Sequence, residues 1–186
     1  LVTSDVGGGS RVPLPPYDGP LPEEITDELG CPVDNGRITQ GPHTGPSHGN
    51  TDAYDFGSPQ ETEVRATHGG YVAKLLDGVP LNQFCDGGTW CSFGNYVQLV
   101  GKNGDGEEFF TTYAHMMPGL AVDQTEQWVN KGQLLGYVDA TGYTFGPCNG
   151  RKPPCVGTHL HYQYDGPGEL ELPPGCGGTS GVRPQP

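Results

Sequence analysis

The stretch GTHLHYQYD, residues 157–165, places two histidines one residue apart in a segment whose composition is typical of a β-strand. Successive side chains of a strand point to opposite faces, so we expect His159 and His161 to share a face, about 7 Å apart. Leu160 points the other way and can pack into a core. Two imidazoles on one strand face suit metal binding, but they also suit hydrogen bonding in a polar sheet. The rest of the chain has to decide between these uses.

Short apolar runs rich in β-branched and aromatic residues begin at about residue 64 and predict a series of strands. Glycine (32 residues) and proline (19) make up over a quarter of the 186 residues and supply the turns between them. The stretch KNGDGEE predicts a hairpin turn, and only residues 23–30 can form one or two helical turns. The sequence therefore predicts an all-β domain. The expected strands cover residues 63–67, 69–76, 95–101, 107–116, 133–142 and 159–164.

Both ends of the chain differ from this central region. Residues 1–40 contain VGGGSRVPLPPYDGPLPEE, which is rich in glycine and proline and has no hydrophobic periodicity. We therefore predict an extended N-terminal arm over 1–40, a β domain over 41–176 and an irregular tail over 177–186.

The charge and hydropathy of the chain limit its partners. The formal net charge of −13 disfavours nucleic acids and anionic membrane surfaces, because both repel an acidic protein. No run approaches 18 apolar residues, so we expect no membrane span. The first ten residues lack the basic and apolar regions of an export signal, and we expect any such signal to lie outside this sequence.

Six cysteines form no CxxC pair, which disfavours a structural zinc ribbon. Six thiols allow 15 pairings. The spacing favours two local bonds that close short loops and a third between the chain ends, namely Cys85–Cys91, Cys148–Cys155 and Cys31–Cys176. An even number of cysteines in such positions is typical of secreted proteins.

The six histidines lie in different contexts. A catalytic zinc needs three protein ligands and one position left for water. A histidine of the glycine-rich loop over residues 41–52, followed by Asp55 and joined by one histidine of the strand pair, would supply such a set. Histidines left over could act as bases beside the water. His68, in ATHGGY, is most simply a solvent-exposed turn residue with no role.

From about residue 41 to residue 164 the chain resembles the lysostaphin-type and β-lytic zinc metallopeptidases, which cut peptide cross-links in bacterial cell walls. The motifs that carry the resemblance follow in the family's order: AYDFGSPQETEVRATHGGYV, GNYVQLV, TTYAHM, KGQLLGYVDATG and GTHLHYQ. The resemblance implies one antiparallel, open-barrel-like β-sheet with irregular loops, stapled here by the disulfides. It also implies a bound Zn²⁺.

The resemblance also implies roles for individual residues. Asp55 falls on the family's metal-binding aspartate, and His161, second in HxH, falls on the third metal ligand. His48 is preferred as the first ligand, with His43 as the alternative. Asp52 is expected to be an ordinary loop residue.

Two further histidines match the catalytic positions of the family. His115 of YAHM and His159, the first of HxH, fall on them. The chain is then expected to be a secreted zinc metalloendopeptidase that hydrolyses bonds in peptidoglycan cross-links or glycine-rich peptides. The alternative is a non-catalytic module, a structural or binding subunit of an extracellular homo-oligomer or assembly held by the N-terminal arm. The enzyme is favoured because all five positions are filled.

Overall fold

The computed structural model describes residues 17–45, 48–80, 93–142, 144, 157–169 and 171–178. Within these residues the chain contains no helix, which confirms the predicted all-β class. The strands are β1 (Arg37–Gln40), β2 (Ala53–Gly57), β3 (Glu63–Arg65), β4 (Gly70–Leu76), β5 (Asn95–Lys102), β6 (Glu108–Met116), β7 (Trp128–Val129), β8 (Leu134–Tyr137) and β9 (His159–Asp165).

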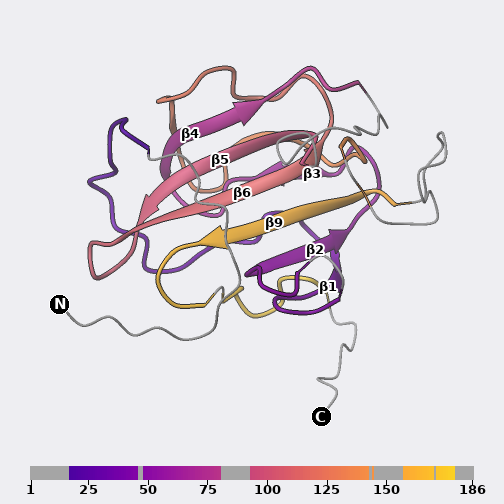
Figure 1. Ribbon diagram of the computed structural model, residues 1–186, viewed down its shortest axis with the longest axis horizontal. Coiled ribbons are helices and arrows are strands. Elements are labelled where there is room, and N and C mark those ends of the chain that lie inside the picture. Colours follow the sequence, from indigo (N-terminus) through magenta and orange to yellow (C-terminus); the bar gives the residue numbers. More distant parts are fainter. Residues whose placement is uncertain are drawn as a thin grey trace, which may run out of the picture.

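Seven strands form one antiparallel sheet in the order β1-β2-β9-β6-β5-β4-β7, and β3 pairs with β8 in a second, smaller sheet. Figure 1 shows β4, β5, β6, β9 and β2 side by side, with β1 beyond β2. The large sheet stays open, as expected. The hairpin between β5 and β6 is also where the sequence predicts it. Its turn is held by the Asn103 side-chain oxygen, which accepts hydrogen bonds from the backbone N–H groups of Asp105 and Glu107.

One face of the large sheet packs in the hydrophobic core, and the other carries the polar side chains of the candidate site. In the register of β2 and β9, Phe56 lies opposite Leu160, and the two side chains are fully buried in the hydrophobic core. Asp55 lies opposite His161, one residue along each strand, and therefore on the other face. The alternation expected for HLH is thus observed: Leu160 packs in the core, and both histidines point away from it.

Three strands lie outside the sequence predictions, namely β1, β2 and β7. The predicted helical turns over residues 23–30 are wrong, because this segment runs beside the β5–β6 hairpin. There the Thr26 N–H donates to the Lys102 carbonyl at 2.7 Å, and Thr26 forms a parallel bridge with Asn103. A tertiary contact has replaced the local i to i+4 bonds of a helix.

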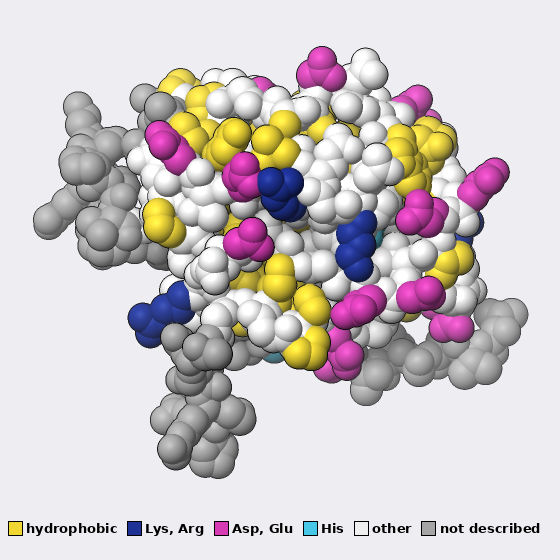
Figure 2. Space-filling view, turned by 180° about the vertical axis from the view of Figure 1, so that it is seen from behind, with side chains coloured by type: hydrophobic (Ala, Val, Ile, Leu, Met, Phe, Trp, Pro, Cys, Tyr) yellow, Lys and Arg dark blue, Asp and Glu magenta, His cyan; other side chains and the backbone are white. Residues whose placement is uncertain are grey.

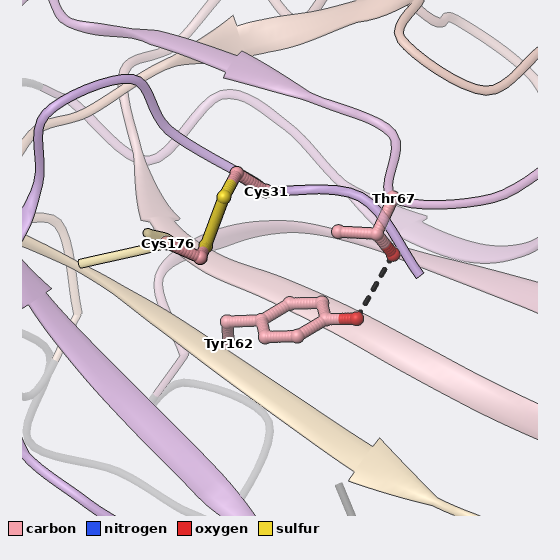
Figure 3. The surroundings of a disulfide bond; sticks show 4 residues. All are labelled: Cys31, Thr67, Tyr162 and Cys176. Atoms are coloured by element: carbon pink, nitrogen blue, oxygen red, sulfur yellow. Dashed lines mark hydrogen bonds between the residues drawn. A yellow bond between two sulfur atoms is a disulfide. The ribbon is translucent and has the colours of Figure 1, made fainter. Parts of the chain in front are cut away.

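A disulfide joins Cys31 to Cys176, as the spacing predicted, across a sequence separation of 145. Figure 3 shows it near Tyr162, whose hydroxyl hydrogen bonds to Thr67 at 2.9 Å. The other predicted pairs, Cys85–Cys91 and Cys148–Cys155, fall outside the described residues. Within the expected arm, Cys31 forms this bond and residues 37–40 form β1, while residues 1–16 fall outside the described residues. The division of the chain into domains stays a prediction.

The expectation that His68 is exposed is wrong, because its side chain is fully buried. One ring nitrogen lies 2.8 Å from the Gly69 carbonyl oxygen and the other 2.8 Å from the Thr111 hydroxyl. Gly101 makes room for the ring, since a Cβ at this position would lie only 2.8 Å from His68 Nδ1. Burial lowers the pKa of His68 to about 4.

This buried histidine predicts an acid-sensitive term in stability. Between pH 6.5 and about 4 the unfolded chain binds a proton at His68 that the folded chain does not, so the free energy of unfolding falls as the pH falls. The loss should reach about 3 kcal/mol. Urea unfolding of the wild type and of His68→Gln across this range should show a steeper pH dependence in the wild type. Equal slopes would contradict the prediction.

Candidate metal centre

Three side chains converge on the face of the sheet away from the core. The pairing of β2 with β9 sets Asp55 directly opposite His161. His48 comes from the loop before β2 and is fully buried. Its Nδ1 lies 3.1 Å from the Gly41 carbonyl oxygen, and a backbone bond from Thr51 N–H to the His48 carbonyl tightens the loop. The glycine-rich loop thus delivers an imidazole to a pair fixed by strand register.

The three potential ligand atoms form a nearly regular triangle. His48 Nε2 lies 3.2 Å from Asp55 Oδ1, His161 Nδ1 lies 3.0 Å from the same oxygen, and the two nitrogens are 3.3 Å apart. Tetrahedral zinc with ligands at 2.0–2.1 Å would set edges of about 3.3 Å. Two imidazole nitrogens and one carboxylate oxygen also match the ligand types of catalytic zinc sites. The residues therefore fit the ion that the sequence led us to expect.

The alternative ligand His43 lies elsewhere. Its side chain is exposed, and it is absent from the cluster that His48, Asp55 and His161 form. Asp52 is buried and is likewise no member of that cluster. The structure thus brings together the preferred set, while metal binding by it stays a prediction.

The two expected catalytic histidines lie beside the cluster. The ring centroids of His115 and His159 are 4.7 Å apart, and His159 Nε2 is 3.7 Å from Asp55 Oδ1. His115 Nδ1 lies 2.8 Å from the Thr141 carbonyl oxygen, and His159 Nδ1 lies 2.9 Å from that of Gly157. Because a carbonyl only accepts, each Nδ1 carries the proton in the neutral ring, and each Nε2 is left with a lone pair.

Burial and neighbouring charges set the ionisation of these groups. Burial alone would raise the pKa of Asp55, but its close contacts with the His161 and His48 rings hold that pKa far below its usual range. Burial acts to lower the pKa of His48, yet the bond to Asp55 and its charge raise it overall. Burial lowers the pKa of His115, reinforced by the charges of His159 and His161, and burial also lowers the pKa of His159. Both catalytic candidates are therefore neutral at pH 7 and able to accept a proton.

The backbone at His115 adopts an uncommon conformation, with a φ of 63°. Its neighbour Met116 is held by two bonds to its carbonyl oxygen, one from the Thr141 hydroxyl at 2.7 Å and one from the Asn95 amide at 3.1 Å. The Asn95 N–H in turn donates to the Thr141 hydroxyl at 3.0 Å. Thr141 and Asn95 thus stabilise the backbone conformation that turns the His115 ring toward the cluster. Both residues occur in motifs quoted above, Asn95 in GNYVQLV and Thr141 in DATG, but the sequence analysis gave them no role.

Sequence reasoning also missed contacts to His161. Its Nε2 lies 3.3 Å from Gln163 Oε1, and Gln163 Nε2 donates to Asp165 Oδ2 at 2.7 Å. The Phe93 ring stacks on the His161 ring with centroids 5.5 Å apart. The period of two along β9 places Gln163 and Asp165 on the face of His161, a signal that could have found them. No comparable signal exists for Phe93.

Known proteins are similar to this chain in sequence or in fold. The chain is 33% identical over 109 residues to the DD-carboxypeptidase/endopeptidase Mpg of Neisseria meningitidis serogroup B, a match that covers 59% of this chain and 18% of that protein. A zinc-containing peptidase from Vibrio cholerae has a similar fold, with a TM-score of 0.52 and 22% identity over 78% of this chain and 41% of that one. Csd3 of Helicobacter pylori gives a TM-score of 0.51 and 20% identity over 83% and 36%.

The sequence profile of Peptidase family M23 matches residues 49–170, well over half of the chain and nearly all of the large sheet. This range includes Asp55, His115, His159 and His161, and it begins directly after His48. Sequence, fold and the arrangement of the cluster agree, and the chain belongs to peptidase family M23.

Proposed function

We propose that this protein is a zinc metalloendopeptidase that hydrolyses peptide bonds, with the cross-links of peptidoglycan as its main substrate class. One observation carries the proposal: in an M23 chain, His48 Nε2, Asp55 Oδ1 and His161 Nδ1 lie within 3.3 Å of one another, beside two neutral histidines. A structural site usually has four protein ligands, whereas three leave a position for water or substrate.

His48, Asp55 and His161 would hold the ion. Zinc, when bound, supplies Lewis acidity, which lowers the pKa of water and polarises the scissile carbonyl. Asp55 stays ionised because its pKa is far below the usual range, so it contributes a full negative charge to the site. The bond between His48 Nδ1 and the Gly41 carbonyl keeps the His48 Nε2 lone pair turned toward the site.

His115 and His159 would move the protons. Each has Nδ1 tied to a backbone carbonyl and Nε2 available, and each has a lowered pKa. One Nε2 takes a proton from the attacking water as a general base. The other, once protonated, donates to the developing oxyanion or to the leaving amine. This pair takes the place that a single glutamate base holds in HExxH metallopeptidases.

The substrate and the compartment follow from several observations. The relative from Neisseria is named a DD-carboxypeptidase/endopeptidase, which supports cell-wall peptides as substrates, and glycine-rich peptides are the second class. The disulfide between Cys31 and Cys176 supports secretion into an oxidising environment. Acidic side chains are spread over the face shown in Figure 2, with few basic ones among them, which disfavours nucleic acids as partners. The described residues include no helix that is long and apolar enough to cross a membrane.

Metal removal tests the function. The protein should release soluble peptides from purified peptidoglycan, lose this activity when a chelator strips it of metal, and recover it with about one equivalent of Zn²⁺. Product release is followed by mass spectrometry, with glycine-rich peptides as parallel substrates. Turnover that survives complete metal removal would contradict the mechanism. Metal binding without turnover on any of these substrates would instead support the non-catalytic module.

A further inference from the structure

The four histidines of the site differ in how the ring nitrogen away from the site is held. In three of them Nδ1 is tied to a backbone carbonyl, which the fold itself supplies: Gly41 for His48, Thr141 for His115 and Gly157 for His159. His161 is different. Its Nδ1 belongs to the cluster, and its Nε2 meets a side chain, Gln163. The orientation of this ring can therefore be altered by one substitution.

The orientation of the Gln163 amide is fixed by Asp165. Its Nε2 lies 2.7 Å from Asp165 Oδ2, and an ionised carboxylate only accepts hydrogen bonds, so the NH₂ group must point to Asp165. The amide oxygen is then turned toward His161 Nε2, 3.3 Å away. An amide oxygen also only accepts, so Gln163 favours the His161 tautomer that carries its proton on Nε2. That tautomer leaves the lone pair on Nδ1, 3.0 Å from Asp55 Oδ1, where a metal ion shared with Asp55 would bind.

Strand geometry builds this arrangement without help from loops. His161, Gln163 and Asp165 alternate along β9 and therefore share one face. β9 lies in the interior of the sheet, where β2 and β6 pair with it on either side. The three side chains thus stand on a backbone held by two ladders, which keeps their spacing fixed.

We propose that Gln163 is a positioning residue for the metal site: it fixes the tautomer and ring orientation of His161, and Asp165 fixes the amide of Gln163. This inference rests on the proposed function only in taking His161 as a ligand. Partners of this kind change metal affinity by about 10- to 100-fold when they are removed. Gln163→Leu keeps a similar volume and loses the acceptor, so it should weaken zinc binding by that factor. Gln163→Glu keeps an acceptor oxygen for His161 but loses the donor to Asp165, so it should lose less zinc affinity than Gln163→Leu does.

Zinc affinity, measured by competition with a chromogenic chelator at constant pH, tests the proposal without reference to turnover. Gln98 is the matched control, because it is a buried glutamine on the same face of the sheet, in β5. Its amide donates to the Thr112 hydroxyl, whereas the amide oxygen of Gln163 accepts from His161. Gln98→Leu should keep wild-type affinity. Nitrogen-15 spectra of the metal-free protein should show a larger share of the Nε2–H tautomer of His161 in the wild type than in Gln163→Leu.

The outcomes separate the two ideas. Wild-type affinity in Gln163→Leu, or an equal loss in Gln98→Leu, overturns the positioning role and leaves the proposed function standing. A wild-type protein that binds no zinc overturns both. If Gln163→Leu does not fold, Asp165→Asn decides, because an amide at 165 can donate as well as accept and frees Gln163 to turn over. Reduced zinc affinity in that variant supports the role, and unchanged affinity overturns it.

Discussion

Asp55→Asn is expected to abolish measurable hydrolysis and to weaken zinc binding by at least about 10³-fold. The substitution keeps the size of the side chain and removes the only anionic member of the ligand cluster. At an effective dielectric constant of 20, two unit charges 4 Å apart interact by about 4 kcal/mol, and 1.4 kcal/mol corresponds to a factor of ten. The attraction between the Asp55 carboxylate and a divalent ion in direct contact is at least that strong, so the substitution should remove at least about 4 kcal/mol of binding free energy. Zinc affinity by chelator competition and peptide release from peptidoglycan give the two readouts.

Asp52→Asn is the matched control. Asp52 lies three residues before Asp55 and is buried, but it is outside the cluster. The variant should bind zinc and release peptides as the wild type does. If Asp52→Asn lost zinc while Asp55→Asn kept it, the ligand assignment would be wrong.

His115→Ala is expected to lower kcat/KM by about 10²- to 10⁴-fold, the usual contribution of general acid–base catalysis, while zinc binding stays near that of the wild type. The reason is geometric. The imidazole of His115 packs against His159 at a centroid distance of 4.7 Å. His115 is not one of the three residues of the proposed metal cluster, which are His48, Asp55 and His161. His159→Ala should lose activity to a similar degree, and the double variant should lose far less than the product of the two, because both histidines serve one proton transfer sequence.

Steady-state kinetics on a quenched peptide, together with zinc content by elemental analysis, measure this pair of effects. His43→Ala supplies the control, since His43 is exposed and outside the cluster. Loss of zinc from His115→Ala, or full activity in it, would remove His115 from the catalytic machinery.

The strands that the sequence predicted lie in short runs that contain apolar residues. β5, with the sequence NYVQLVGK, is buried along seven of its eight residues and carries apolar side chains on both of its faces. β1 has four residues with none buried, and β7 has only two residues, so neither offers a recognisable pattern. β2 is short, and Asp55 stands at its centre. These three strands exist because partners far away in the sequence supply their hydrogen bonds, which local propensity cannot reveal.

The candidate site, too, was predictable from the sequence only in part. Strand alternation alone put His159 and His161 on one face, and the family resemblance pointed to Asp55 and His115. The approach of His48 to Asp55 depends on how the loop before β2 folds back, which only the tertiary structure provides. Exposure of His68 was mispredicted because the space it occupies is created by Gly101, 33 residues further along the chain.

The bond between Cys31 and Cys176 encloses every strand found among the described residues. A protease that cuts any loop between these positions therefore produces two fragments that remain covalently attached. β2 and β9, which carry Asp55 and His161 and are neighbours only in space, would then still meet at the high effective concentration of a single molecule. If the protein is secreted as we propose, a cut by an extracellular protease would therefore leave Asp55 and His161 together.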